Sequence, residues 1–366
     1  MKNFQKLLAS AFVLALLAMA PSVAEAQNCN KNPNHPRCGG GGSDDGNGGG
    51  NGGGNGGGAP VIYNWMPSDI GVAFDSGITG AGSHIVTLDN FSGTTYPGNL
   101  DGTVQSLTHG AWTSLQSSLM APGASSVDVN QPSGRRDRSG SITRHYSSSA
   151  TLQVVNLSFG LFDPVGTDVD DPNYSFGYSI WDSLVDEANN PVGDAVFVKA
   201  SGNLNGQTVD TGTLNIGFPL PSPHLDVLNL SLIGAPNALF VGALNPTGTI
   251  ADYSTIAGDD TVVQDMFLVA TVRDDLTGLA GTSFAAPIVS GVAALVGDKH
   301  EAYLLGIDNR AEIVVDHLLE TAQTDTIGDF SDSCTLTVDG KCERSSIYGV
   351  GEVSITNALS PISPPQ

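Results

Sequence analysis

The sequence predicts an α/β fold in which helices cover both faces of a mostly parallel sheet. Four short apolar runs, rich in β-branched and aromatic residues, have the length and composition of buried strands: residues 84–88, 154–157, 195–198 and 239–241. At least 30 residues separate consecutive runs, which leaves room for the crossover connections that parallel strands need. Open parallel sheets present functional groups at the carboxyl ends of their strands, so we expect the chemistry just after these runs.

The chain begins with the features of a secretory signal peptide. Lys2 and Lys6 precede an apolar run from Leu7 to Ala20, and Ala24-Glu25-Ala26 has the small-x-small pattern of a cleavage site. The run is roughly 14 residues long, shorter than the ~20 that a membrane-spanning helix needs. Residues 1–26 are therefore predicted to be removed on export, and the mature protein to be secreted outside the cell, kept in the periplasm or attached loosely to the cell surface.

The charge balance excludes some classes of partner. The chain has 14 Lys and Arg against 37 Asp and Glu, a net charge of −23. Removing residues 1–26 takes away Lys2, Lys6 and Glu25, which leaves 12 basic and 36 acidic residues and a net charge of −24. So negative a surface repels phosphate backbones and anionic headgroups, which argues against nucleic acid and membranes as partners. We expect a monomer.

Four cysteines predict two local disulfides in an oxidising compartment. Cys29 and Cys38 lie nine residues apart and Cys334 and Cys342 lie eight apart, and each pair brackets a polar loop. Of three possible pairings, 29–38 with 334–342 is the simplest. The spacings do not match those of common zinc sites, which disfavours the metal-binding alternative.

Composition also divides the chain. A short Cys-bracketed segment at 27–38 is followed by residues 39–58, in which 14 of 20 positions are glycine. Such a stretch cannot bury a core and behaves as a flexible linker. One globular domain is predicted at 59–366.

The strongest chemical signal is a serine before an apolar helix. Gly281-Thr282-Ser283-Phe284-Ala285-Ala286-Pro287 precedes the nearly all-apolar residues 288–295, which indicate a buried helix. Unpaired backbone N–H groups at a helix start favour negative charge, so an oxyanion beside Ser283 would be stabilised there. An isolated serine in this place is usually an N-cap, but this motif is much more restrictive.

Residues 281–291 resemble the nucleophile motif of the subtilisin-like serine peptidases. His109-Gly110, followed at a distance by Ala121-Pro122-Gly123-Ala124, is similar to the family's histidine segment, and Ala200-Ser201-Gly202-Asn203 is similar to its oxyanion segment. The resemblance covers about residues 59–360. It implies a three-layer fold with a mostly parallel sheet of about seven strands.

The third catalytic residue is predicted to be Asp89. It ends the first apolar run, and residues 79–89 resemble the family's lead-in to that strand. The family's aspartate is usually followed by Ser or Thr and then Gly, whereas Asn90 and Phe91 stand here. Asp75-Ser76-Gly77 matches that tripeptide but lacks the glycine-rich lead-in. We therefore interpret the match as coincidental and do not assign Asp75 a catalytic role.

The resemblance implies a role for each residue. Asp89 orients His109, which takes the proton of Ser283, while Asn203 and the Ser283 amide stabilise the oxyanion. The substrate would lie along Ser158-Phe159-Gly160 and beside Ala200-Ser201-Gly202. The predicted activity is that of a serine endopeptidase that cleaves polypeptides through an acyl-enzyme.

Two alternatives stay open at this point. A sedolisin-type acid peptidase shares a Gly-Thr-Ser motif and suits the pI near 4.2, but it uses carboxylates where this chain has His109. A catalytically inactive peptide-binding or surface protein is favoured by the departure at Asn90 and Phe91.

No cofactor is expected to be required. Calcium, which many members of the family bind, has one candidate place in the acidic loop at 163–171, where a solvated loop is the simpler interpretation.

Overall fold

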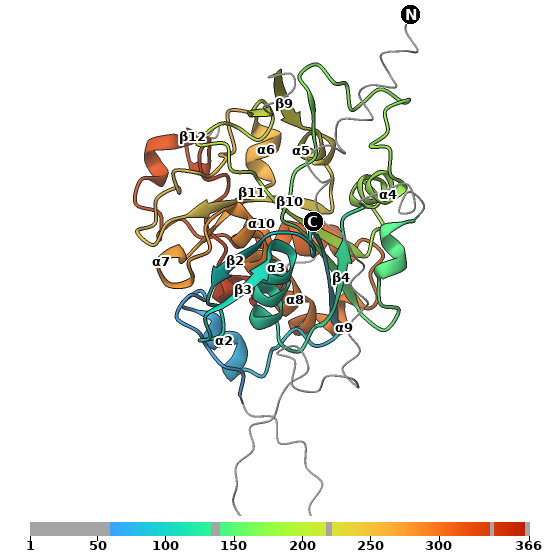
Figure 1. Ribbon diagram of the computed structural model, residues 1–366. Helices are drawn as coiled ribbons and strands as arrows, with labels where there is room; N and C mark the ends of the chain where they lie inside the picture. Colours follow the sequence, from blue (N-terminus) through green and yellow to red (C-terminus); the bar gives the residue numbers. More distant parts are fainter. Residues whose placement is uncertain (1–58, 133–139, 217–221, 337–339, 363–366) are drawn as a thin grey trace, which may run out of the picture.

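The computed structural model describes residues 59–132, 140–216, 222–336 and 340–362. The predicted signal peptide, the Cys29–Cys38 pair and the glycine-rich linker lie outside these ranges. The core of the described chain is a six-stranded sheet in the order β11-β10-β7-β5-β1-β4, and all of its strand pairs are parallel (Figure 1). Its strands are β1 (Ser83–Asp89), β4 (Ser125–Asn130), β5 (Leu152–Leu157), β7 (Ala195–Ala200), β10 (Ala238–Leu244) and β11 (Phe267–Thr271).

The four predicted apolar runs lie within β1, β5, β7 and β10. Every residue of these four strands is buried, because helices cover both faces of the sheet. The remaining two strands are at the edges, and the exposed residues of β4 explain its weak apolar signal. The described sheet thus has six strands, against an expectation of about seven.

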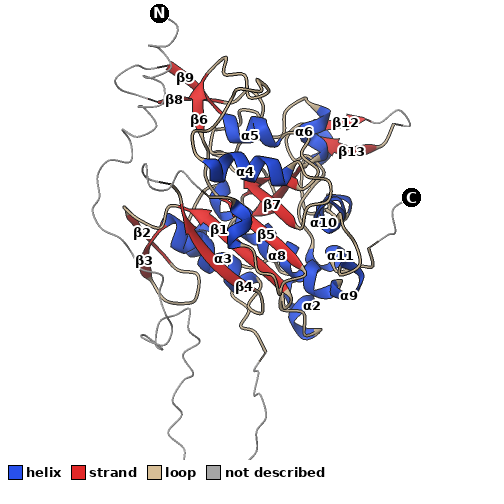
Figure 2. Ribbon diagram, turned by 90° about the vertical axis from the view of Figure 1, so that its right-hand side faces the viewer, coloured by secondary structure: helices blue, strands red, loops and turns tan. Residues whose placement is uncertain are grey.

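Two hydrophobic clusters, one on each face, make the fold three-layered. One face packs against α3 (His109–Met120), α8 (Ala286–Lys299) and α10 (Arg310–Glu320), together with the short helices α2 (Ile70–Asp75), α9 (Glu301–Leu304) and α11 (Ile355–Ala358). The other face packs against α4 (Ser179–Ala188), α5 (Val227–Leu232) and α6 (Thr261–Asp265). Figure 2 shows α4 and α5 on one side of the sheet and α2 and α8 on the other.

Helix α8 is the central helix of its layer. Its first 12 residues, from Ala286 to Gly297, are all buried. A Cβ atom at Gly291 would lie 2.2 Å from Cβ of Met120, so only glycine lets α8 cross α3 this closely. This close packing holds α8 against the end of α3.

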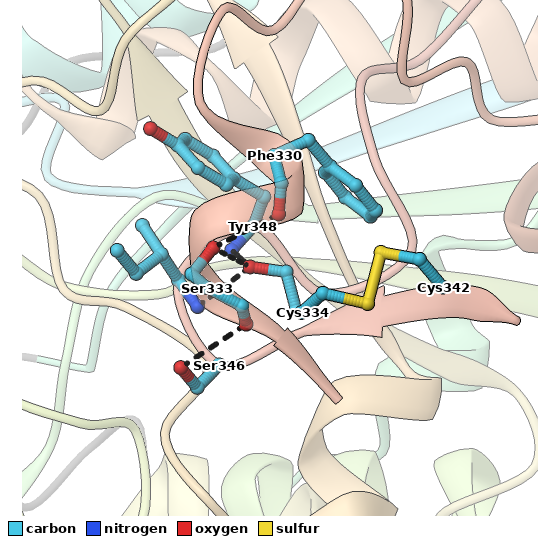
Figure 3. Close-up of a disulfide and its surroundings, with 8 residues drawn as sticks. Phe330, Ser333, Cys334, Cys342, Ser346 and Tyr348 are labelled. Carbon is cyan, nitrogen blue, oxygen red and sulfur yellow. Dashed lines mark hydrogen bonds between the residues drawn. A yellow bond between two sulfur atoms is a disulfide. The ribbon is translucent and has the colours of Figure 1, made fainter. Parts of the chain in front are cut away.

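Three small antiparallel sheets surround the core. They are β2 (Thr95–Gly98) with β3 (Gln105–Thr108), β6 (Phe162–Pro164) with β9 (Ser222–Asp226) and β8 (Thr213–Ile216), and β12 (Cys334–Leu336) with β13 (Cys342–Ser345). The last hairpin contains the predicted Cys334–Cys342 disulfide, with a Cα–Cα distance of 5.6 Å (Figure 3). Beside it, the rings of Phe330 and Tyr348 stack with centroids 6.2 Å apart.

The remaining described elements are short: α7 (Asp274–Thr277) and the 3-10 turns η3 (Ile142–His145), η4 (Thr282–Phe284) and η5 (Phe330–Ser333). Among the residues that the structure describes, no helix has the length and apolarity to span a bilayer.

Candidate active site

The candidate site is built at the carboxyl ends of three neighbouring strands. Asp89 ends β1, Ser158 follows β5, and residues 200–203 begin at the last residue of β7. Since β1, β5 and β7 are adjacent in the sheet, these segments lie side by side at one edge. The edge predicted from the sequence is therefore where the polar residues meet.

Asp89 is a buried carboxylate with several donors around it. Its side chain is 1% exposed. Oδ1 accepts hydrogen bonds from the backbone N–H of Asn90 at 2.6 Å and from Nδ1 of His109 at 2.8 Å. Oδ2 lies 3.0 Å from the same Nδ1 and 3.1 Å from Oγ1 of Thr113. These donors offset the cost of burying the charge.

The alternative aspartate lies elsewhere. Asp75 is an exposed residue at the end of α2, whereas the hydrogen bonds to His109 come from Asp89. The structure therefore brings Asp89 and His109 together, as the strand-based prediction requires.

His109 begins α3 and is oriented from both sides. Thr108 is the N-cap of this helix, and its hydroxyl accepts the N–H of Ala111 at 3.4 Å. One edge of the ring faces Asp89, and the ring of Phe284 packs nearby with centroids 5.8 Å apart. The His109 side chain is 30% exposed, so a ligand can reach it while its Asp89 partner stays buried.

The residues after Asp89 explain why glycine follows His109. The N–H of Gly110 donates to the carbonyl of Asn90 at 2.9 Å. A Cβ at Gly110 would lie 2.9 Å from that carbonyl oxygen and 2.9 Å from the Phe91 ring. The unusual Asn90-Phe91 pair thus folds over the start of α3, and only glycine fits beneath it.

Ser283 lies in η4, one short turn before α8. The sequence predicted this serine at the amino end of the helix and Pro287 in the first turn; α8 begins at Ala286, and Pro287 does occupy its first turn. The Ser283 hydroxyl donates to the carbonyl of Ser158 at 3.0 Å, and the Ser158 hydroxyl donates to the carbonyl of Ser283 at 3.0 Å. This reciprocal pair joins the predicted nucleophile to the predicted substrate strand.

Asn203 is held in one orientation beside the serine. Its Oδ1 accepts the backbone N–H of Thr282 at 2.9 Å and the Thr282 hydroxyl at 3.1 Å. With Oδ1 occupied, the amide nitrogen Nδ2 keeps its protons for another acceptor. Gly281 has φ 127°, a left-handed conformation that favours glycine, and lets the chain pass close to this amide.

A buried ion pair lies next to the two segments predicted to bind substrate, residues 158–160 and 200–202. Nζ of Lys199 is 3.2 Å from Oδ2 of Asp226 and 2.6 Å from the carbonyl of Ala200. Oδ1 of Asp226 accepts the N–H of Leu161 at 3.0 Å. The ion pair therefore connects the segment that follows β5 with the end of β7. Burial lowers the pKa of Lys199, and the charge of Asp226 opposes that shift.

Sequence reasoning missed several residues of this site. They are Thr113, Thr282, Lys199 with Asp226, and Asn156, whose Nδ2 donates to the Ser158 hydroxyl at 3.0 Å. Asn156 and Lys199 carried a usable signal, because each is a polar residue inside an otherwise apolar buried strand. The others are defined only by contacts between distant segments.

The described residues contain no group of three or more His, Cys, Asp or Glu side chains arranged to hold a metal ion. In the acidic loop, Oδ1 of Asp168 accepts the N–H of Asp170, and Oδ1 of Asp171 accepts the N–H of Asn173. These carboxylates thus stabilise the turns of their own loop.

With this geometry in view, comparison with known proteins defines the class. A model of the subtilase family, peptidase family S8, matches residues 109–351, more than half of the chain. The chain belongs to the subtilase family. It is accordingly a serine endopeptidase of subtilisin-like fold, and its substrates are polypeptides.

Solved structures of similar fold include three proteases. The serine protease of Aeromonas sobria is 18% identical, with a TM-score of 0.49, over 80% of this chain and 63% of that one. The prenylagaramide maturation protease PagA is 18% identical, with a TM-score of 0.47, over 81% of this chain and 100% of that one. The MycP3 protease from the type VII (ESX-3) secretion system is 20% identical, with a TM-score of 0.45, over 82% and 90%. A search of curated proteins found no match to the chain.

Proposed function

We propose that this chain is a secreted endopeptidase that hydrolyses peptide bonds through Asp89, His109 and Ser283. The observation that carries the proposal is the pair of hydrogen bonds from His109 Nδ1 to the buried carboxylate of Asp89. A carboxylate in this position keeps the imidazole proton on Nδ1 and leaves Nε2 free to take a proton. Ser283, just before α8, supplies that proton.

The reaction proceeds in two halves. Nε2 of His109 takes the hydroxyl proton as Oγ of Ser283 attacks the substrate carbonyl carbon, and the carbonyl oxygen becomes an oxyanion. Nδ2 of Asn203 and the N–H of Ser283 stabilise this oxyanion. His109 then gives its proton to the leaving amine, and the C–N bond breaks to leave an acyl-enzyme. Water, deprotonated by His109, releases the acyl group and restores Ser283.

Substrate binding is also proposed to change the hydrogen-bond partner of the Ser283 hydroxyl. In the structure the Ser283 hydroxyl donates to the carbonyl of Ser158, which belongs to the predicted substrate strand. A substrate strand whose N–H groups pair with residues 158–160 would compete for this carbonyl. The serine hydroxyl would then turn to His109.

Labelling with a fluorophosphonate probe tests the assignment of Ser283. We expect wild-type protein to be labelled and to hydrolyse casein, and the Ser283→Ala variant to lose labelling and several powers of ten in turnover. Ser76→Ala, an exposed serine at the end of α2, is the control and should behave as wild type. Near-normal hydrolysis by Ser283→Ala would refute the proposal, and an unlabelled, inactive wild type would support a peptide-binding protein instead.

The pH–activity profile separates this proposal from an acid peptidase. His109 must be neutral to act as a base, so activity should be high at neutral pH and fall in acid. An optimum near pH 4, with activity surviving His109→Ala, would favour a sedolisin-type mechanism.

Dialysis against EDTA should leave activity unchanged, since we propose that no metal is required.

Export is tested by where the protein is found. Cleavage after Ala26 predicts a mature protein that begins at Gln27, which N-terminal sequencing of protein from the culture medium or periplasm would identify. A chain that stays inside the cell with Met1 intact would exclude export.

A further inference from the structure

Thr113 is a buried hydroxyl that the proposed mechanism has not yet used. It lies on α3, one turn after His109, and is 0% exposed. Its Oγ1 is 3.1 Å from Oδ2 of Asp89 and 3.1 Å from the carbonyl oxygen of Gly110. A hydroxyl has one proton to give, so these two acceptors compete for it.

The carboxylate is the stronger acceptor of the two. Hydrogen bonds to an ionised group are shorter and about twice as strong as those between neutral groups. The carbonyl of Gly110 is the ordinary partner of a threonine within a helix, and such a bond contributes little. A charged Asp89, buried to 1% exposure, therefore draws the Thr113 proton towards Oδ2.

The hydrogen bonds around Asp89 show what the Thr113 hydroxyl contributes to the carboxylate. On Oδ1 the carboxylate has a short bond from the Asn90 backbone. On Oδ2, among the described residues, it has only the Thr113 hydroxyl beside the shared Nδ1 of His109. The side chain of Asn90 points elsewhere, since its Oδ1 accepts the N–H and hydroxyl of Ser92. The residue directly after Asp89 thus supplies no hydroxyl to the carboxylate.

We propose that Thr113 is the positioning residue that fixes the carboxylate plane of Asp89. Its hydroxyl anchors Oδ2, so that Asp89 cannot rotate away from Nδ1 of His109. This inference rests on the proposed triad. Thr113 acts through Asp89 and does not itself touch substrate.

The first test removes the hydroxyl at constant shape. Thr113→Val should lower kcat by about 10- to 100-fold, the scale of one hydrogen bond to a charged group, with KM unchanged. Thr113→Ser, which restores the hydroxyl, should recover kcat to within about threefold of wild type. Rates are expressed per active site titrated with fluorophosphonate, and Thr113→Ala serves as a second variant should Thr113→Val fold poorly.

Ser117→Ala is the matched control. Ser117 lies on the same helix, is 1% exposed, and its hydroxyl donates to the carbonyl three residues earlier, Ser114, at 3.1 Å. It therefore has the ordinary helix bond without the carboxylate. Wild-type kcat in Ser117→Ala supports the inference, whereas equal losses in Thr113→Val and Ser117→Ala would overturn it in favour of a general effect on α3.

A double-mutant cycle with Asp89→Asn separates the inference from the proposed function. If Thr113 acts through Asp89, then Thr113→Val should cause no further loss of kcat in the Asp89→Asn background. Independent, multiplying losses would overturn the positioning role and leave the triad intact. Near-normal activity of Asp89→Asn alone would instead overturn the triad itself.

Discussion

At the scale of single residues, the site depends on side chains whose acceptor oxygens are already hydrogen-bonded. Oδ1 of Asn203 is occupied by Thr282, and both oxygens of Asp89 have donors. Such fixed groups need no reorganisation when charge develops during a reaction. Substitutions here should therefore change turnover much more than substrate affinity.

The choice between two aspartates gives the sharpest residue-scale prediction. Asp89→Asn presents an amide to His109 and favours the wrong tautomer, so turnover at neutral pH should fall by about 10⁴-fold. Asp75→Asn, at an exposed position, should stay within about threefold of wild type. Steady-state kinetics on a peptide substrate measure both. The reverse result would show that the third catalytic residue is Asp75.

A second residue-scale prediction concerns the oxyanion. Asn203→Ala should lower kcat by about 100- to 1000-fold with little change in KM, because its amide is proposed to bind only the developing charge. Asn189→Ala, at the exposed end of α4, is the control and should leave both constants unchanged. A change confined to KM would make Asn203 a substrate-binding residue.

At the scale of elements, the Lys199–Asp226 ion pair connects the segments predicted to bind substrate. Asp226 also caps α5, since its Oδ1 accepts the N–H of Leu228 at 3.2 Å. It thereby connects β7, the segment after β5 and the start of α5. Such a buried pair is costly to break, because removing one partner leaves the other charge buried alone.

Asp226→Asn should therefore destabilise the fold strongly. The amide can still cap α5, but Lys199 loses its counter-charge, and we expect the free energy of unfolding to fall by about 3–5 kcal/mol. Urea denaturation followed by circular dichroism measures this. The exposed pair of Arg273 and Asp275 provides the control, and Asp275→Asn should give no measurable change. Equal stability of wild type and Asp226→Asn would show that Lys199 is accommodated without its partner.

The strands and loops also show which parts of the fold and of the site could be predicted from local sequence. Strands β1, β5, β7 and β10 were predictable because burial on both faces leaves a continuous apolar run. Edge strand β4 was not, because Ser125 and Asp128 interrupt its pattern. Local motifs predicted the segments that meet at the site. Contacts such as Asp226 with Leu161 depend on how the chain folds over long distances, so no local pattern contained them.

At the scale of the whole molecule, histidines that are buried or half-buried couple stability to pH. Burial lowers the pKa of His84, His145 and His300, and the neighbouring His317 lowers that of His300 further. His84 is held by the Ser125 hydroxyl at 2.8 Å and by the carbonyl of His145 at 3.0 Å. Each of these rings is thus more easily protonated in the unfolded chain than in the native one.

The sign of the effect follows from proton binding. As the pH falls through and below about 6.5, the ordinary pKa of histidine, the unfolded state takes up more protons than the native state, so stability should fall as the pH falls. Each such histidine contributes at most about 1.4 kcal/mol per pH unit. His300→Gln should flatten the decline in Tm across this range, as measured by calorimetry. An unchanged slope in this variant would exclude His300 as a contributor.

The place of Ser283 at the entrance to α8 also has a consequence for how activity arises during folding. Helix α8 packs on β1, β5 and β7 and on α3, all of which precede it in the sequence. Parallel pairing over such sequence distances is intrinsically slow, because loop entropy is lost before the contacts form. A chain whose synthesis has not yet reached residue 283 holds Asp89 and His109 but no Ser283. The proposed triad cannot assemble before that point, so we expect peptidase activity to appear only late in folding, after α8 has packed against the sheet.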